Sequence, residues 1–345
     1  MLSNETCENT SSVSAAESPL TSALMFTAGV TGNLVALVIL GLHKKDNRSH
    51  VSLFHILVTG LLVTDLAGTL LISPVVLTAY ARGRSLKALD LCQYCAFAMA
   101  FFGLASMLIL FAMAVERCLS LSHPYFYQRH TSKRCGIVAV SAAYAFCVLF
   151  CLLPQWGFGE NTQYCPGTWC FIRLSSPARA HLAYSVLYAA LMLVLIVSIL
   201  ICNLSVFVNL CLMCRRQSAR RGSTLPGTRR RDRFPHSEEA NHLVLLVIMT
   251  VIFVVCSVPL TVRAFIGAIV PDNEHMRDLT ALRCLSFNSI IDPWIFIILN
   301  TSVVKKGLAR ILCCKISSRK QEMQIATSNI RTETIKQDVI WDRQS

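Results

Sequence analysis

Charged residues are scarce in this sequence. Asp, Glu, Lys and Arg together make up 15% of the 345 residues, whereas 54% of the residues are hydrophobic. Soluble domains average about 25% charged residues, and a chain with so few would be hard to keep in solution. The composition therefore excludes an ordinary soluble protein and indicates a membrane protein.

Several familiar patterns are also missing. No series of segments with alternating hydrophobicity occurs, which excludes a transmembrane β-barrel. The sequence has no His-Glu-x-x-His, no Gly-x-Ser-x-Gly and no paired catalytic aspartates, so we expect neither an enzyme nor a metal site or cofactor. The first nineteen residues lack a basic segment followed by an apolar one, so no cleavable signal peptide is predicted.

Long apolar stretches take the place of these patterns. A helix needs about 20 mostly apolar residues to cross a bilayer, and only helices or closed barrels satisfy their own backbone groups in lipid. We therefore predict an all-α membrane protein, a bundle of seven transmembrane helices within residues 20–300. The predicted spans are residues 20–42, 51–80, 92–121, 135–158, 181–214, 242–270 and 279–300.

Lys and Arg are unevenly distributed. Most of the 32 lie at residues 44–48, 117–134, 215–240 and from 305 onwards. The positive-inside rule then predicts a multi-pass plasma membrane protein with an extracellular N-terminus and a cytoplasmic C-terminus. The net charge of +13 reflects this topology, and nucleic acid is not an expected partner. In the outer segment, residues 1–19, Asn4 and Asn9 begin N-glycosylation sequons.

The basic loop at residues 215–240 is rich in arginine and has a Pro-Gly turn, so we expect it to be disordered. One interpretation is a solvated loop held against anionic membrane lipids. The other is that Ser218 and Ser223, each preceded by two arginines, are phosphorylation sites.

The segment after the last span has two further features. Residues 301–314 place their apolar side chains on one helical face, which predicts an amphipathic helix on the membrane surface. Cys313 and Cys314 end it and are candidate palmitoylation sites. Residues 315–345 are predicted to form a disordered cytoplasmic tail.

Five of the 16 cysteines fall near the outer, oxidising side: Cys7, Cys92, Cys95, Cys165 and Cys170. A bridge between Cys92 and Cys170 would hold the loop after the fourth span over the helix ends. Cys7 with Cys165 is a plausible second bridge, although spacing does not determine connectivity. Cys95 is expected to be a free thiol.

Polar residues inside the predicted bundle need an explanation. Asp65, Asn33, Ser106, Asn288 and Asp292 could converge on one buried cluster. Such a cluster either holds the helices together by hydrogen bonds or acts as a functional switch. Prolines that would break a helical hydrogen-bond ladder and allow a bend are Pro74, Pro154, Pro259 and Pro293.

Arg283 lies near the outer end of the seventh span, on the helical face opposite to Asp292. Its side chain either reaches up to the lipid headgroups or faces a cavity and binds an anion. A guanidinium is well shaped to hold a carboxylate through two hydrogen bonds.

Short motifs now point to a family. Glu116-Arg117-Cys118 and "DPWIF", which runs from Asp292 through Pro293 to Phe296, resemble motifs of rhodopsin-like G-protein-coupled receptors. Longer stretches are similar to the prostanoid receptors within that class, namely "ISPVV", "HPYFYQR", "QYCPGTWCF" and "LRCLSFNSIIDPW". The sequence is therefore identified as a member of the prostanoid receptor family.

This resemblance implies roles for individual residues. Arg283 would hold the carboxylate of a twenty-carbon prostaglandin, with hydrogen bonds added by Tyr80 and Thr168. Trp169 would help to cover the pocket, and Ser286 would contact the ligand nearer its chain.

The resemblance also implies a mechanism. Ligand binding would shift the inner halves of the sixth and seventh helices, so that Arg117 leaves Glu116 and a G protein can bind. Asp65, Asn288, Asp292 and Pro293 would belong to this switch. Departures from the common pattern of the class are Cys118, Ser257 and Phe296.

Some stretches of the sequence also indicate which prostaglandin the receptor prefers. Stretches such as "LFAMAVER" look most like prostaglandin E receptors of the second subtype, which act through the stimulatory G protein and cyclic AMP. "YSVLY" also resembles prostaglandin D receptors. A prostaglandin D or prostacyclin receptor with the same coupling is thus the alternative, and a membrane transporter is the alternative from another class.

Overall fold

The structure is a computed structural model that describes residues 9–13, 18–46, 53–221, 236–269 and 275–300. Residues 1–231 and 242–297 form one compact unit. Residues 232–241 and 298–345 form a second unit, of which only 236–241 and 298–300 are among the described residues. Every contact given below lies within the first unit.

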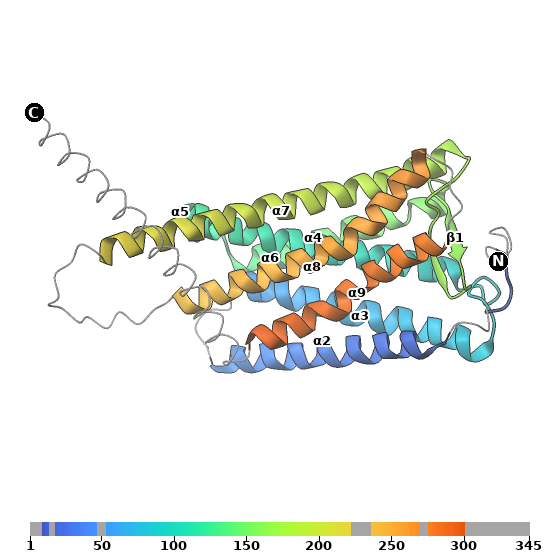
Figure 1. Cartoon of the computed structure of the whole chain (residues 1–345), viewed down its shortest axis with the longest axis horizontal. Coiled ribbons are helices and arrows are strands. Elements are labelled where there is room, and N and C mark those ends of the chain that lie inside the picture. The colour runs from blue at the N-terminus through green and yellow to red at the C-terminus, as the bar shows by residue number, and fades with distance from the viewer. Residues whose placement is uncertain (1–8, 14–17, 47–52, 222–235, 270–274, 301–345) are drawn as a thin grey trace, which may run out of the picture. The chain divides into compact units, whose positions relative to one another are not determined.

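Long helices make up most of the described chain (Figure 1). They are α2 (Leu20–Asp46), α3 (Leu53–Arg82), α4 (Cys92–Ser122), α6 (Lys133–Cys151), α7 (Arg179–Arg221), α8 (His236–Ile269) and α9 (His275–Asn300).

Among the described residues, 7 segments are long and apolar enough to cross a membrane. Each matches one of the predicted spans, so the prediction of an all-α bundle with seven spans is confirmed. The observed spans are Leu20–Leu42, Leu53–Arg82, Cys92–Ser122, Lys133–Trp156, Arg179–Asn209, Val247–Ile269 and Arg277–Ile298.

Helix α4 is the central helix of the unit and packs against α3, α6 and α7. Its small residues Ala98 and Ala105 are buried in this packing. Large apolar side chains on the outer faces, for example Val38 and Ile201, are exposed in the isolated chain. These faces suit contact with lipid tails.

Helix α2 meets α9 where Trp294 lies over a glycine. The Trp294 indole nitrogen donates a hydrogen bond to the Ala28 carbonyl oxygen at 3.2 Å. A Cβ atom at Gly32 would lie only 2.8 Å from that nitrogen, so the close contact requires glycine at this position.

A β-hairpin, which the sequence analysis did not predict, lies in the loop between α6 and α7 at one end of the helices (Figure 1). Strands β1 (Asn161–Tyr164) and β2 (Trp169–Ile172) pair antiparallel, with Tyr164 opposite Trp169. The Tyr164 hydroxyl donates to the Ile172 carbonyl oxygen at 2.8 Å. Burial, and secondly the charge of Asp278, raise the pKa of Tyr164, so this hydroxyl keeps its proton.

The fourth span differs from its prediction. It was expected to run to residue 158, but α6 ends at Cys151 and a 3₁₀ turn, η1 (Leu153–Trp156), follows. Pro154 lies in this turn. The α-helix ends before it, because proline has no N–H to donate and its ring would clash with the preceding helical turn. The prediction that Pro154 bends a helix is therefore wrong. Pro74, Pro259 and Pro293 do lie inside α3, α8 and α9.

The basic loop is shorter than predicted. Helix α7 continues to Arg221, and α8 begins at His236, so the prediction that residues 215–240 are disordered is wrong at both ends. The stretch from 215 to 221 contains neither Gly nor Pro, and its arginines are good helix formers. Residues 222–235 lie outside the described part of the chain.

Candidate functional site

A cavity lies among α2, α3, α4, α8 and α9 and is covered by β2. It encloses about 980 Å³ of free space, counted out to its open side. Most of its walls are apolar, with side chains such as Met25, Val76, Met99, Phe102 and Leu285. A largely apolar cavity with a few polar groups is the usual setting for binding a small molecule.

Two of the predicted binding residues line this cavity. Trp169, 7% exposed, contributes from strand β2, and Ser286 contributes from α9. The Ser286 hydroxyl donates to the Leu282 carbonyl oxygen of its own helix at 3.0 Å. The predicted roles of both residues in ligand contact stay predictions.

The other predicted binding residues lie next to the cavity rather than in its lining. The Thr168 hydroxyl donates to the Tyr80 hydroxyl at 3.4 Å, which brings the hairpin and the C-terminal end of α3 together. Arg283 is partly buried on α9, one turn before Ser286. None of these three is among the described residues that line the cavity.

Several lining residues were missed by the sequence analysis. Met99 and Phe102 on α4 carry no signal that separates them from ordinary residues of a helix bundle. Ile72 and Ser73 on α3 belong to the quoted stretch "ISPVV", which could have drawn attention to them.

Arg263 is a second arginine within a span, and it forms an ion pair with Asp278. Its Nε lies 2.7 Å from Asp278 Oδ1, and both side chains are largely buried. This ion pair joins the C-terminal part of α8 to the first turn of α9, beside the hairpin residue Tyr164.

The cavity extends to polar side chains near the middle of the helices. Asp65, Ser106 and Asn288 are among its lining residues. The Ser106 hydroxyl donates to Asp65 Oδ1 at 2.7 Å, which confirms that these two residues meet. Asp292 is likewise buried, on α9.

The two asparagines of the predicted cluster bond elsewhere. Asn33 Nδ2 donates to the carbonyl oxygens of Gly29 at 2.9 Å and Ser289 at 3.1 Å. Asn288 Nδ2 donates to the Ser257 hydroxyl at 3.2 Å. Ser257 is one of the positions that depart from the class, and its small hydroxyl is what allows this bond between α8 and α9.

A charged cluster lies at the other end of α4. Arg117 Nε lies 3.3 Å from Glu116 Oε2, and the Arg117 guanidinium is 3.8 Å from the centre of the Phe54 ring. The Tyr127 hydroxyl donates to Glu116 Oε1 at 2.5 Å. Tyr127 comes from the short helix α5 (Pro124–His130). It lies in the quoted stretch "HPYFYQR", but the sequence analysis gave it no role.

Tyr127 is held as a hydrogen-bond donor in this cluster. Burial, followed by its contact with the Glu116 carboxylate, raises the pKa of Tyr127, so the phenol stays protonated at physiological pH. The buried Glu116 carboxylate is thus held by two groups, Arg117 and Tyr127. Cys118 faces Ser122 at 4.0 Å in place of the usual tyrosine.

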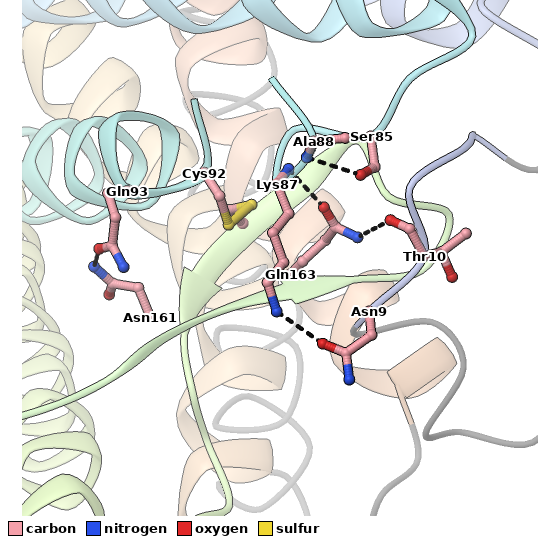
Figure 2. The surroundings of a disulfide bond; sticks show 10 residues. Asn9, Thr10, Ser85, Lys87, Ala88, Cys92, Gln93, Asn161 and Gln163 are labelled. Carbon is pink, nitrogen blue, oxygen red and sulfur yellow. Dashed lines mark hydrogen bonds between the residues drawn. A yellow bond between two sulfur atoms is a disulfide. The ribbon is translucent and has the colours of Figure 1, made fainter. Parts of the chain in front are cut away.

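The hairpin is attached to the helices by a disulfide (Figure 2). Cys92, the first residue of α4, is bonded to Cys170 in β2, with the Cα atoms 5.3 Å apart. This confirms the predicted bridge. Cys95 is a buried free thiol, as predicted. Cys165 is also disulfide-bonded, and its predicted partner Cys7 lies outside the described residues.

The N-terminal residues 9–13 join the same structure (Figure 2). Gln163 of β1 accepts a hydrogen bond from the Lys87 backbone N–H at 2.9 Å and donates to the Thr10 carbonyl oxygen at 3.2 Å. Lys87 Nζ donates to Asn9 Oδ1 at 2.8 Å. Asn9 itself is exposed, so a glycan on its Nδ2 atom would not have to displace packed side chains.

The remaining predicted sites are not placed. Ser218 is in the last turns of α7, where only the backbone is described. Asn4, Ser223, Cys313, Cys314, the amphipathic helix at 301–314 and the tail at 315–345 lie outside the described residues.

The chain is similar to known seven-helix receptors in sequence and in fold. The family described as 7 transmembrane receptor (rhodopsin family) matches residues 32–296. The crystal structure of squid rhodopsin superposes with a TM-score of 0.66 at 14% identity, covering 80% of this chain and 75% of that chain. The fold and the family match define a rhodopsin-family seven-transmembrane receptor.

Relatives in sequence narrow this class. The chain is 52% identical over 313 residues to the prostacyclin receptor of Rattus norvegicus, covering 89% of this chain and 73% of that receptor. It is 48% identical over 353 residues to the prostaglandin E2 receptor EP2 subtype of Homo sapiens, covering 97% of each. The chain belongs to the prostanoid receptors of the rhodopsin family. It is a multi-pass membrane receptor and not an enzyme.

Proposed function

We propose that this receptor binds a prostaglandin at the cell surface, with prostaglandin E as its preferred ligand, and activates the stimulatory G protein to raise cyclic AMP. The observation that carries the proposal is the apolar cavity under Trp169, in a chain about half identical to receptors named for prostaglandin E2 and prostacyclin. The topology that fits has the hairpin end of the helices outside and the Glu116 end inside.

The ligand would use both parts of the outer region. Arg283 would bind its carboxylate, with Tyr80 and Thr168 beside it, while the hydrocarbon chains fill the apolar cavity. Each buried CH₂ contributes about 0.8 kcal/mol, and each charge-assisted hydrogen bond about 1.5–3 kcal/mol. Burial of the chains therefore supplies most of the affinity, and Arg283 supplies selection for an acid.

Activation would couple the two ends of α4. The inner part of the cavity contacts Asp65 and Asn288, and the buried bond from Asn288 to Ser257 joins α9 to α8. A ligand that prefers a different arrangement of α8 and α9 shifts the receptor towards it. A G protein that binds after Arg117 leaves Glu116 prefers the same state, so the two binding events assist each other.

The preferred ligand can be tested by measuring cyclic AMP in cells that express the full chain, dosed in parallel with prostaglandins E2, D2 and I2. A response led by prostaglandin E2 supports the proposal. A response led by prostaglandin I2 supports the second candidate, a prostacyclin receptor, which the 52% identity to the rat protein favours. No rise with any of the three, at normal surface expression, contradicts coupling to the stimulatory G protein.

Replacing Tyr127 with Phe is expected to raise basal cyclic AMP several-fold without added ligand. The substitution removes the donor that helps hold Glu116, and hydrogen bonds to charged groups contribute about 1.5–3 kcal/mol when buried. Tyr127 is only partly buried, so we expect an effect in the lower part of that range.

The matched control for this variant is Tyr125→Phe, in the same short helix but 78% exposed. It should leave basal cyclic AMP unchanged. Equal basal activity in the two variants, at equal surface expression, would show that Tyr127 does not hold the inactive state.

A further inference from the structure

The hydroxyl group of Tyr188 is buried and has no hydrogen-bond partner among the described residues. Tyr188 lies on α7 and is 2% exposed. A buried hydroxyl that is left unpaired costs about 1–3 kcal/mol, and most buried polar groups in native proteins are paired. An unpaired hydroxyl at this depth therefore needs an explanation.

The Tyr188 ring is held by aromatic neighbours. Phe171 of β2 meets it edge-on, with ring centres 5.7 Å apart and an interplanar angle of 83°. Phe150 of α6 lies at 6.3 Å with an angle of 36°. Because the ring is packed from two sides, it does not easily turn to bring its hydroxyl to another partner.

The hydroxyl lies behind the cavity wall, next to the lining residue Gly103. A Cβ atom at Gly103 of α4 would lie 3.8 Å from the Tyr188 oxygen and 3.5 Å from Leu285 Cδ2. Gly103 and Leu285 both line the cavity. The absence of a side chain at position 103 thus leaves the Tyr188 oxygen close to the space that the ligand would fill.

We propose that the Tyr188 hydroxyl is a specificity-determining contact, which donates a hydrogen bond to a hydroxyl oxygen of the ligand, away from its carboxylate. This inference rests on the proposed function, since prostaglandins carry hydroxyl groups on their ring and chain. It explains why a hydroxyl, and not a phenylalanine ring, stands in an otherwise apolar contact among α4, α6 and β2. A bound prostaglandin would satisfy the group that is unpaired in the free receptor.

The test is competition binding to the full-length receptor in membranes, using prostaglandin E2 and its 11-deoxy and 15-deoxy analogues. Tyr188→Phe is expected to lower the affinity for prostaglandin E2 by about tenfold. It should leave unchanged the affinity for the analogue that lacks the contacted oxygen, because that analogue has no bond to lose. The thermal stability of the ligand-free variant should be equal or higher, since an unpaired buried hydroxyl has been removed.

Two further variants sharpen this test. Tyr184→Phe is the matched control one turn earlier on α7, because the Tyr184 hydroxyl already donates to the Phe150 carbonyl oxygen at 3.3 Å. It should not distinguish prostaglandin E2 from its deoxy analogues. Gly103→Ala fits at ordinary contact distance and adds a methyl group beside the Tyr188 oxygen at a position that lines the cavity, so it should reproduce the selective loss.

The outcomes separate this inference from the proposed function. If the wild-type receptor binds none of the three ligands, the choice of prostaglandin E2 is wrong. If it binds them and Tyr188→Phe changes no affinity, or lowers all three equally, the Tyr188 contact is wrong and the proposed function stands.

Discussion

Replacing Arg283 with Ala is expected to raise the prostaglandin concentration needed for half-maximal cyclic AMP by about 100-fold or more. A guanidinium can hold a carboxylate through two charge-assisted hydrogen bonds, each contributing about 1.5–3 kcal/mol, and 1.4 kcal/mol corresponds to a factor of ten. Surface expression should persist, because Arg283 lies near the outer end of α9 and outside the polar cluster around Asp65. The measurement is a dose–response curve together with surface labelling of the same cells.

Controls identify the carboxylate as the partner of Arg283. The methyl ester of the ligand should bind the wild-type receptor weakly and should lose little further affinity in Arg283→Ala, because it has no charge to pair. Arg283→Lys should fall between the two, since an ammonium keeps the charge but not the planar pair of donors. Arg277→Ala, an exposed arginine earlier on α9, should match the wild type. An unchanged response in Arg283→Ala would favour the other interpretation, an arginine that reaches up to the lipid headgroups.

Replacing Cys92 or Cys170 with Ser is expected to abolish high-affinity binding and most surface expression. The disulfide closes a loop with a sequence separation of 78, and removal of a native disulfide from a small domain typically costs about 2–5 kcal/mol. Thr168 and Trp169 directly precede Cys170, so loss of the bond releases the strand that covers the cavity. Saturation binding and surface labelling measure the two effects.

The double variant should behave like either single one, because one substitution already breaks the bond. Cys95→Ser is the matched control, since Cys95 lies one turn into α4 as a buried free thiol. Its expected loss is small by comparison. Binding at wild-type affinity in Cys92→Ser would show that hydrogen bonds such as those of Gln163 are enough to hold the hairpin in place.

Prediction from the sequence succeeded where a physical constraint acts within one segment. A span must be about 20 apolar residues long and must satisfy its own backbone, so hydropathy was sufficient to find all seven. The Glu116–Arg117 pair was found because the two residues are adjacent and match a known motif. It failed where an element ends for a local reason that hydropathy does not record, as where α6 ends at Cys151 before Pro154.

Contacts between segments needed the tertiary structure. Helical periodicity places residues on a face of one helix, but it does not say which faces meet. Nothing in the sequence pairs Asn288 with Ser257, and nothing brings Tyr127 to Glu116. Nothing in the sequence places Tyr188 next to the cavity residue Gly103, and the two meet only because α4 and α7 pack together there. Hydropathy and motifs therefore led to the class of receptor, while the packing of one helix against another decided the shape of its cavity.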